Sequence, residues 1–362
     1  MGTSSRCSRA ARTSRLVNAS SSGRTSRKTA PCSALATIST TPSSTRSHVV
    51  ETVLPTAGRI KDRRTEVSRI LCVHGVGQQR ECPDTLHAEW FPALSDGCLL
   101  AGEQLSAADV TCVFYGNLFR PPGRALAVGD PMIAPEDLDE FEAELLGVWW
   151  QEAARVDSAV VAPDAQTLVA TPPTVQRALR ALSGSSFFAG LADRALLFDL
   201  RQVRRYFQEP EVRQAAQQAL AAAMTPEVRV VVGHSLGSVV AYETLCAHPA
   251  WSVEMLLTLG SPLGIRHLIF DRLQPAPALG SPDDPQGSWP ESVGRWVNIA
   301  DKGDVVALEK DLRRRFGSRV DGYLVSNGAT AHGIRPYLTA AETGRAIRQG
   351  LTSSPVIRPA LP

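Results

Sequence analysis

One serine in this chain stands in a setting that suits nucleophilic chemistry. It lies in Gly233-His-Ser-Leu-Gly237, which fits the pattern G-x-S-x-G. A serine hydroxyl is a weak nucleophile unless a tight turn holds it beside a base and close to backbone N–H donors. A glycine two residues away on each side lets the neighbouring backbone pass close to that turn. The pattern therefore predicts that Ser235 is a nucleophile in a strained backbone conformation.

The sequence on either side of Ser235 supplies the elements that such a turn joins. Before it, residues 228–232 are mostly valine, which favours a buried parallel strand. After it, Leu236 to Leu245 is compatible with a helix. The pattern indicates a nucleophile only in this context of strand, turn and helix. The simpler alternative is an ordinary turn between a strand and a helix that contains a serine.

When a serine of this kind is activated, an acid and then a histidine are expected later in the chain. Arg295 to Ala300 predicts a strand, and two aspartates follow it. Asp304 is the preferred acid, because the two valines after it would anchor its loop in the core, and Asp301 is the alternative acid. Either aspartate could instead cap the start of a helix.

His332 is the only histidine that follows these acids. It lies in the loop-like stretch from Asn327 to Pro336, after the short apolar run 323–325. A base must reach the serine hydroxyl with one ring nitrogen while a carboxylate holds the other. A loop histidine next to a glycine can do both, so His332 is the candidate base. The alternative is an exposed loop histidine without a role.

An early strand and the loop after it would supply backbone donors for a developing oxyanion. Ile70 to Val73 predicts this strand, and His74-Gly75 follows it. In such sites one donor is an N–H of this loop, and the other is the N–H of the residue after the nucleophile. Val76 and Leu236 are therefore the candidate donors, with Gly75 as the near alternative. The simpler alternative is a glycine-rich turn, and His74 is expected to be structural.

The rest of the pattern predicts an α/β fold with a mostly parallel central sheet flanked by helices. Further strands are expected over 109–115 and 255–259, and helices over 85–100 and 340–351, with Leu99 among the core contacts. Alternating strands and helices with short connections form right-handed βαβ units. Ser261, after the strand 255–259, lacks the G-x-S-x-G spacing, and the proline that follows it has no N–H.

Residues 120–226 are long for a single crossover between strands. Prolines at 121–122, 131, 135, 172–173 and 210 break the segment, and helices are expected over 136–155, 191–208 and 211–224. We interpret the region as an inserted helical cap followed by the helix that leads to the strand before Ser235. Trp149, Trp150, Phe187 and Phe188 could line an acyl pocket, although such aromatics are more often part of a core.

Charge divides the chain into a basic tail and a mildly acidic body. The net charge over 362 residues is +2, yet residues 1–50 hold eight Lys or Arg and no acid, so the remainder carries −6. The body therefore gives no sign of nucleic-acid binding. Residues 1–65 are rich in Ser, Thr, Arg and Ala and predict a disordered tail, with a folded domain over 66–352 and a flexible tail over 353–362.

The basic start resembles an organelle transit peptide, and the alternatives are a floppy tail or a start codon assigned too far upstream. It lacks the apolar core of a secretory signal, and no run of 18 apolar residues predicts a membrane span. The seven cysteines are widely spaced, and no C-x-x-C occurs. They predict buried, reduced thiols in a cytoplasmic protein rather than a disulfide framework.

These features together resemble the α/β-hydrolase superfamily over about residues 68–350. The resemblance is carried by His74-Gly75, Gly233-His-Ser-Leu-Gly-Ser238, Gly260-Ser-Pro-Leu263, Asn298 to Asp304, and His332. It points to the lipase, esterase and phospholipase branches. The turn at Ser235, the later Gly-Ser-Pro-Leu turn and the helical insert also resemble DDHD-type and related intracellular lipid esterases.

The resemblance implies a serine hydrolase of carboxylic esters that uses neither a metal nor a cofactor. Ser235 would attack the ester carbonyl, His332 would take its proton and Asp304 would orient His332. The N–H groups of Val76 and Leu236 would hold the oxyanion. The substrate would be a small-molecule or lipid ester, with no membrane span and with peripheral membrane contact left open. The alternatives are an acyltransferase with the same triad, a non-catalytic binding protein of this fold, and a membrane-associated protein that uses the basic tail.

Overall fold

The computed structural model of the protein describes residues 68–120, 133–163, 172–183, 185, 193–281 and 284–353. The segment expected to be disordered, residues 1–65, lies outside these ranges, as does the expected tail apart from Ser353. All of the described residues fall in one unit of the chain, Asp62–Pro362.

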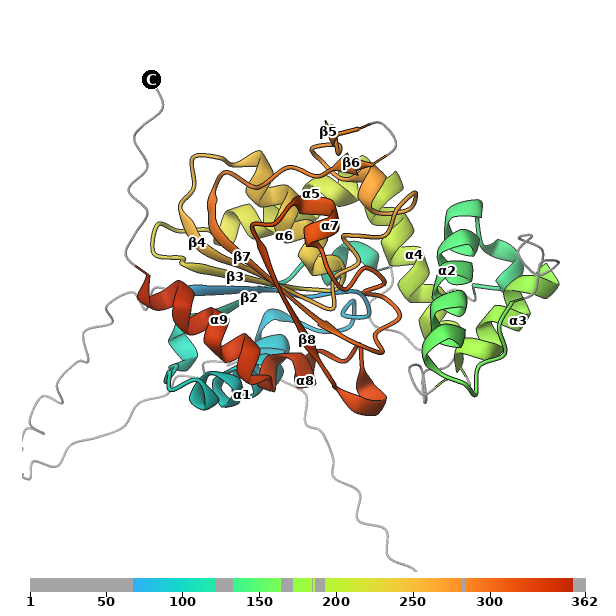
Figure 1. The fold of residues 1–362 in the computed structure, drawn as a ribbon, viewed down its shortest axis with the longest axis horizontal. Helices are drawn as coiled ribbons and strands as arrows, with labels where there is room; N and C mark the ends of the chain where they lie inside the picture. The colour runs from blue at the N-terminus through green and yellow to red at the C-terminus, as the bar shows by residue number, and fades with distance from the viewer. Residues whose placement is uncertain are drawn as a thin grey trace, which may run out of the picture. The chain divides into compact units, whose positions relative to one another are not determined.

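A parallel sheet of six strands forms the centre of the described chain (Figure 1). In spatial order the strands are β2 (Val110–Val113), β1 (Ile70–Val73), β3 (Val230–His234), β4 (Val253–Leu259), β7 (Val293–Asp301) and β8 (Val320–Val325). Each neighbouring pair is parallel, so the expected α/β class is confirmed. The carboxyl ends of these strands lie at one edge of the sheet, where the loops that follow them meet. A separate antiparallel pair, β5 (Leu279–Gly280) and β6 (Pro285–Gln286), lies between β4 and β7 in the sequence.

Helices cover both faces of the sheet. One face carries α1 (Pro83–Leu100), α8 (Ile334–Thr339) and α9 (Ala341–Thr352), and the other carries α5 (Pro210–Ala223) and α6 (Leu236–Ala247) (Figure 1). The short helix α7 (Arg313–Phe316) precedes β8. The helices expected over 85–100 and 340–351 are confirmed with shifts of at most two residues at their ends.

Two separate cores result, because successive strand residues point to opposite faces of a sheet. On β1, Ile70 and Cys72 join the core beneath α1, α8 and α9, whereas Leu71 and Val73 join the core beneath α5 and α6. Strands buried on both faces have nearly continuous apolar sequences, which explains the runs that predicted them. Leu99 was expected in the core but is 56% exposed, because Cys98 takes the buried position on that turn of α1.

The insert between β2 and β3 is helical, as predicted. It contains α2 (Glu140–Val156), α3 (Pro172–Ser183) and α4 (Asp193–Gln208), and then α5. The prediction missed α3. Asp139 caps α2 by accepting the N–H of Glu142 at 2.8 Å. The buried Glu142 carboxylate pairs with Arg201 at 2.6 Å and Arg204 at 3.2 Å, which joins α2 to α4.

Among the described helices, none has both the length and the apolar character that a membrane span requires. Cys72, Cys98 and Cys112 are buried free thiols, as expected. The expectation of burial is wrong for Cys82, which is exposed at the start of α1, and Cys246 is only partly buried. Cys7 and Cys32 lie outside the described residues.

Candidate active site

Ser235 occupies the turn between β3 and α6. Its backbone has a φ of 51° and a ψ of −128°, which few residues other than glycine adopt. Such a conformation costs about 1–3 kcal/mol and persists where the surrounding structure enforces it. The N–H of Ser235 donates to the carbonyl of Leu259 on β4 at 3.0 Å, and its carbonyl accepts the N–H of Ser238 at 2.9 Å. Strand and helix thus hold the serine in the strained conformation that the motif predicted.

The two glycines of the motif lie where other chain segments leave no room for a side chain. A Cβ at Gly237 would overlap the carbonyl oxygens of Val73 and His74. A Cβ at Gly233 would lie 2.6 Å from the Cα of Ser238. The loop after β1 can therefore pack directly against the turn that presents Ser235.

His332 contacts Ser235 and Asp304 with its two ring nitrogens. Nδ1 of His332 lies 2.9 Å from Oδ2 and 3.0 Å from Oδ1 of Asp304. Because an ionised carboxylate only accepts hydrogen bonds, Nδ1 carries the proton. Nε2 is then free to accept the hydroxyl of Ser235, whose Oγ is 3.0 Å away. The structure thus joins three predicted residues in one hydrogen-bonded chain, although 97 residues separate the serine from the histidine.

The Asp304 carboxylate is fully buried yet held in its charged form. Burial alone would raise its pKa, but the charge of His332 and hydrogen bonds from His332 and Tyr337 outweigh that effect and set the pKa at about 2. Oδ1 also accepts the N–H groups of Val306 at 2.9 Å and Ala307 at 3.2 Å. Asp304 is therefore a fixed anion behind the histidine.

Two further residues hold the Asp304 loop in place, and sequence reasoning found neither. The phenol of Tyr337 on α8 donates to Oδ2 of Asp304 at 2.8 Å. Nζ of Lys310 donates to the backbone carbonyl of Asp304 and lies 3.7 Å from Glu152 on α2. Nothing in the sequence around a buried tyrosine or a loop lysine signals these contacts, because they depend on how α8 and α2 pack.

Asp301, the alternative acid, lies at the end of β7, and its carboxylate binds backbone N–H groups. Its carboxylate accepts the N–H of Gly303 at 2.7 Å and the N–H of Asn327. It therefore ties the Asp304 loop to the segment that follows β8. Of the two predicted acids, Asp304 is the one that contacts His332.

Two neutral histidines flank the site. The Nε2–H of His234 donates to the backbone carbonyl of His332 at 3.0 Å, and burial, together with the charge of His332, lowers the His234 pKa to about 3. His74 is buried at the end of β1, where burial lowers its pKa to about 4. Its Nε2 accepts the N–H of Tyr115 at 3.2 Å, which supports the expected structural role.

The two candidate oxyanion donors, Val76 and Leu236, lie in the wall of one cavity with Ser235 and His332. Leu236 is the first residue of α6, where an N–H has no partner within the helix. Within the described chain, neither N–H donates a hydrogen bond. The loop after β1 runs against the serine, since a Cβ at Gly75 would lie 2.8 Å from the Cβ of Ser235.

This cavity is small and its wall is mainly apolar. Its volume is about 40 Å³. The helices α2 and α4 supply part of the wall, and the turn at Ser235 and the loops after β1, β4, β7 and β8 supply the rest. The apolar lining consists of Val76, Leu145, Trp149, Val203, Leu236, Pro262, Ile265, Ile269 and Val306. Apart from His332, Asp199 on α4 is the one charged or titratable side chain among the described lining residues.

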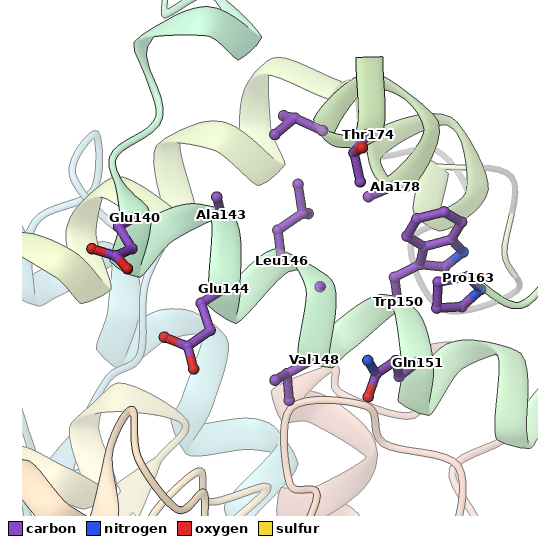
Figure 2. Close-up of a pocket in the computed structure, with 12 residues that line it drawn as sticks. Glu140, Ala143, Glu144, Leu146, Val148, Trp150, Gln151, Pro163, Thr174 and Ala178 are labelled. Carbon is purple, nitrogen blue, oxygen red and sulfur yellow. The ribbon is translucent and has the colours of Figure 1, made fainter. Parts of the chain in front are cut away.

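A larger cavity of about 460 Å³ lies between α2 and α3, and Figure 2 shows its lining. Glu140 and Glu144 lie on its α2 side, and Trp150 lies beside Pro163. Ser235 and His332 are not part of its lining. The predicted aromatic pocket residues are thus divided, because Trp149 lines the small cavity and Trp150 the large one. Phe187 and Phe188 lie outside the described residues.

Ser261 is buried, and its hydroxyl contacts another serine. Its Oγ lies 2.7 Å from Oγ of Ser238 and accepts the N–H of Leu263 at 3.3 Å. Across the described ranges, no group of three or more His, Cys, Asp or Glu side chains is placed to hold a metal ion. Comparisons with protein-family models, with curated proteins and with solved structures found no match.

Proposed function

We propose that the protein is a serine hydrolase of the α/β-hydrolase superfamily that cleaves carboxylic esters through the triad Ser235, His332 and Asp304. The observation that carries the proposal is the 3.0 Å contact between Oγ of Ser235 and Nε2 of His332, with Asp304 on the other side of the ring. The positive φ of Ser235 at a strand-to-helix turn adds support, because backbone strain at a nucleophile holds its hydroxyl toward the substrate.

In the first half of the reaction, Oγ of Ser235 attacks the ester carbonyl while its proton passes to Nε2 of His332. The N–H groups of Val76 and Leu236 would hold the oxygen that becomes negative. The imidazolium then gives its proton to the departing alcohol, and an acyl-enzyme remains. In the second half, His332 takes a proton from the water that attacks the acyl carbonyl. It then returns this proton to Oγ of Ser235 as the carboxylic acid departs. Asp304 stays ionised throughout and stabilises the charged imidazole.

The small cavity favours esters with a short acyl or alcohol group. Its volume of about 40 Å³ accommodates a group of a few atoms. A small-molecule ester is therefore the first choice of substrate, and a lipid ester is the second. We also propose a cytoplasmic location, because the five cysteines among the described residues are free.

A fluorophosphonate probe tests the proposal directly, because it reacts with activated serines. We expect the purified full chain to be labelled and the Ser235→Ala variant to be unlabelled. Ser261→Ala is the matched control, since that serine is buried and no histidine in the described part of the chain contacts its hydroxyl, and the variant should still be labelled. Folded wild-type protein that resists the probe would contradict the catalytic proposal and favour a binding role for the same fold.

An ester series then defines the reaction. We expect turnover of acetyl and butyryl esters to exceed that of esters with eight or more acyl carbons, because of the cavity size. Product analysis in the presence of an alcohol acceptor distinguishes the two acyl-enzyme fates. Free acid as the main product supports hydrolysis, whereas a new ester as the main product identifies an acyltransferase.

A further inference from the structure

Asp199 is an unusual member of the wall around Ser235. It lies on α4, in the same cavity as Ser235 and His332, and its neighbours in that wall include Leu145, Val203 and Ile265. A carboxylate loses favourable hydration in such surroundings, so its presence requires an explanation.

An apolar residue at this position would pack α4 onto its neighbours more favourably than an aspartate does. Leu196, Leu200 and Val203 are buried on α4, and residues three or four positions apart lie on the same face of a helix. Position 199 is three residues after Leu196 and four before Val203, so it lies on the same face of α4, where its side chain is partly buried. An aspartate there interrupts the apolar stripe that packs the helix onto its neighbours.

No described residue forms a hydrogen bond or an ion pair with Asp199. The charged groups near it on α4 have other partners, since Arg201 and Arg204 both pair with Glu142 of α2. Gln202 accepts the N–H of Gly77 at 3.2 Å and donates to Gln79. Burial raises the pKa of Asp199 to about 7, and the charge of His332 offsets that rise only in part. The carboxyl thus faces the reaction site with its hydrogen-bonding capacity unused by the described chain.

We propose that Asp199 is a specificity-determining residue that receives a hydrogen-bond donor of the substrate, a hydroxyl or primary ammonium group close to the scissile ester. This inference rests on the proposed ester hydrolysis and names its substrate class. The donor would lie within two or three bonds of the ester, because Asp199 shares a cavity of about 40 Å³ with Ser235.

The proposed substrate selectivity arises because a substrate without the donor leaves the Asp199 carboxyl without a hydrogen bond. An ester with a methyl group in place of the donor would cover the Asp199 carboxyl without offering it a hydrogen bond. Sites with a buried polar group discriminate strongly against analogues that leave that group unpaired. The effect of one hydrogen bond to a charged group is about 1.5–3 kcal/mol, which corresponds to about 10-fold to 150-fold in kcat/KM.

Matched esters test the inference on the full chain. On the acyl side, 4-nitrophenyl esters of 3-hydroxybutanoate and 3-aminobutanoate are compared with the isosteric 3-methylbutanoate. On the alcohol side, 2-hydroxyethyl acetate is compared with propyl acetate. We expect kcat/KM for the donor-bearing member of at least one set to be about 10-fold or more higher in wild type.

Substitutions then assign the preference to Asp199. Asp199→Leu should remove or reverse it, because an apolar side chain favours the apolar ester. Asp199→Asn should keep a preference for the hydroxyl and lose that for the ammonium, since an amide still accepts a hydrogen bond but carries no charge. Glu144→Gln is the matched control, because Glu144 lies on the outer side of α2 in the larger cavity (Figure 2). It should leave the preference unchanged.

Fluorophosphonate labelling of Ser235 distinguishes a failure of the inference about Asp199 from a failure of the proposed ester hydrolysis. If all variants are labelled at similar rates and wild type shows no donor preference, the inference about Asp199 is wrong and ester hydrolysis stands. A donor preference that survives in Asp199→Leu also overturns the inference. If folded wild type is not labelled, the proposed function fails and the substrate class fails with it. If Asp199→Leu does not fold, Asp199→Asn decides the assignment, because an ammonium preference that survives in that variant would overturn the inference.

Discussion

Tyr337 donates a hydrogen bond to Asp304 at 2.8 Å, and the same phenol oxygen accepts the N–H of Asp301 at 2.8 Å. One hydroxyl on α8 therefore supports both Asp301, at the end of β7, and Asp304, in the loop after it. Burial and the charge of Asp304 raise the pKa of Tyr337, which keeps its proton available for donation. Tyr337 is thus a positioning residue for the proposed acid.

We expect Tyr337→Phe to lower kcat about 10-fold and the free energy of unfolding by about 2 kcal/mol, because a buried carboxylate loses a donor. The folded pKa of Asp304 lies below its unfolded value, so its contribution to stability is complete above about pH 4 and is lost as the pH falls toward 2. In the variant the folded pKa of Asp304 should rise toward the unfolded value, so the acid-induced loss of stability should be smaller and should end at a higher pH. Urea unfolding between pH 3 and pH 7 measures the shift. The exposed Tyr323→Phe is the control, and identical acid sensitivity of the two variants would contradict the positioning role.

The two aspartates should respond differently to the same substitution. Asp304→Asn should reduce kcat about 10⁴-fold, because an amide cannot hold the histidine with its proton on Nδ1. Asp301→Asn should lower stability by about 1–3 kcal/mol through its loop contacts and change kcat only a few-fold. Steady-state kinetics with denaturant unfolding separates the two effects. Equal losses of kcat in both variants would reject the assignment of Asp304 as the acid.

Gly237→Ala should destabilise the fold by about 3 kcal/mol, because its Cβ would overlap the carbonyls of Val73 and His74. Gly147→Ala is the matched control, since Gly147 lies within α2 and a Cβ there meets nothing within 4 Å. Alanine is favoured over glycine in a helix by about 1 kcal/mol, so the control should be neutral or more stable. Thermal unfolding compares them. If Gly237→Ala matched the control, the close approach of β1 to α6 would be disproved.

Removing the Asp199 carboxyl should stabilise the protein at alkaline pH. The folded pKa of about 7 lies above the ordinary aspartate value of 3.8, so the wild-type fold loses stability as the pH rises from about 4 to about 7. We expect Asp199→Leu to be about 2 kcal/mol more stable than wild type at pH 8 and to gain less at pH 5, where the carboxyl is protonated. Denaturant unfolding at both pH values, with Glu144→Gln for comparison, measures the effect. A gain that is independent of pH would show that Asp199 is not held in a dehydrated site.

The sequence predicted the sheet best where strands are buried on both faces. The valine run before Ser235 predicts a strand clearly, because the residues on both faces of β3 are buried in a core. β8 was harder to predict, since only a short apolar run marked it, and at the edge of the sheet its Tyr323 and Leu324 are 43% and 55% exposed. The sequence pattern predicts breaks at the prolines 172 and 210, whereas in the structure they begin α3 and α5. Proline fits the first turn of a helix because its missing N–H would have no partner there.

The order of residues along the chain indicated Ser235, Asp304 and His332, because a strand-to-helix serine constrains where its partners can follow. Order could not indicate Tyr337 or Asp199. Tyr337 reaches Asp304 only through the packing of α8. Asp199 occupies a helical position that its neighbours mark as apolar, and a single charged residue in such a stripe carries meaning only once the cavity beside it is known.

The hydrogen-bonded chain and the cavity wall come from different stretches of the protein. Ser235, Asp304 and His332 follow β3, β7 and β8, whereas Leu145, Trp149, Asp199 and Val203 belong to the insert between β2 and β3. The proposed catalytic groups and the groups proposed to select the substrate can therefore change independently. Exchanging α2 to α4 for the corresponding insert of another protein would then alter the proposed substrate preference while Ser235, Asp304 and His332 stay in place.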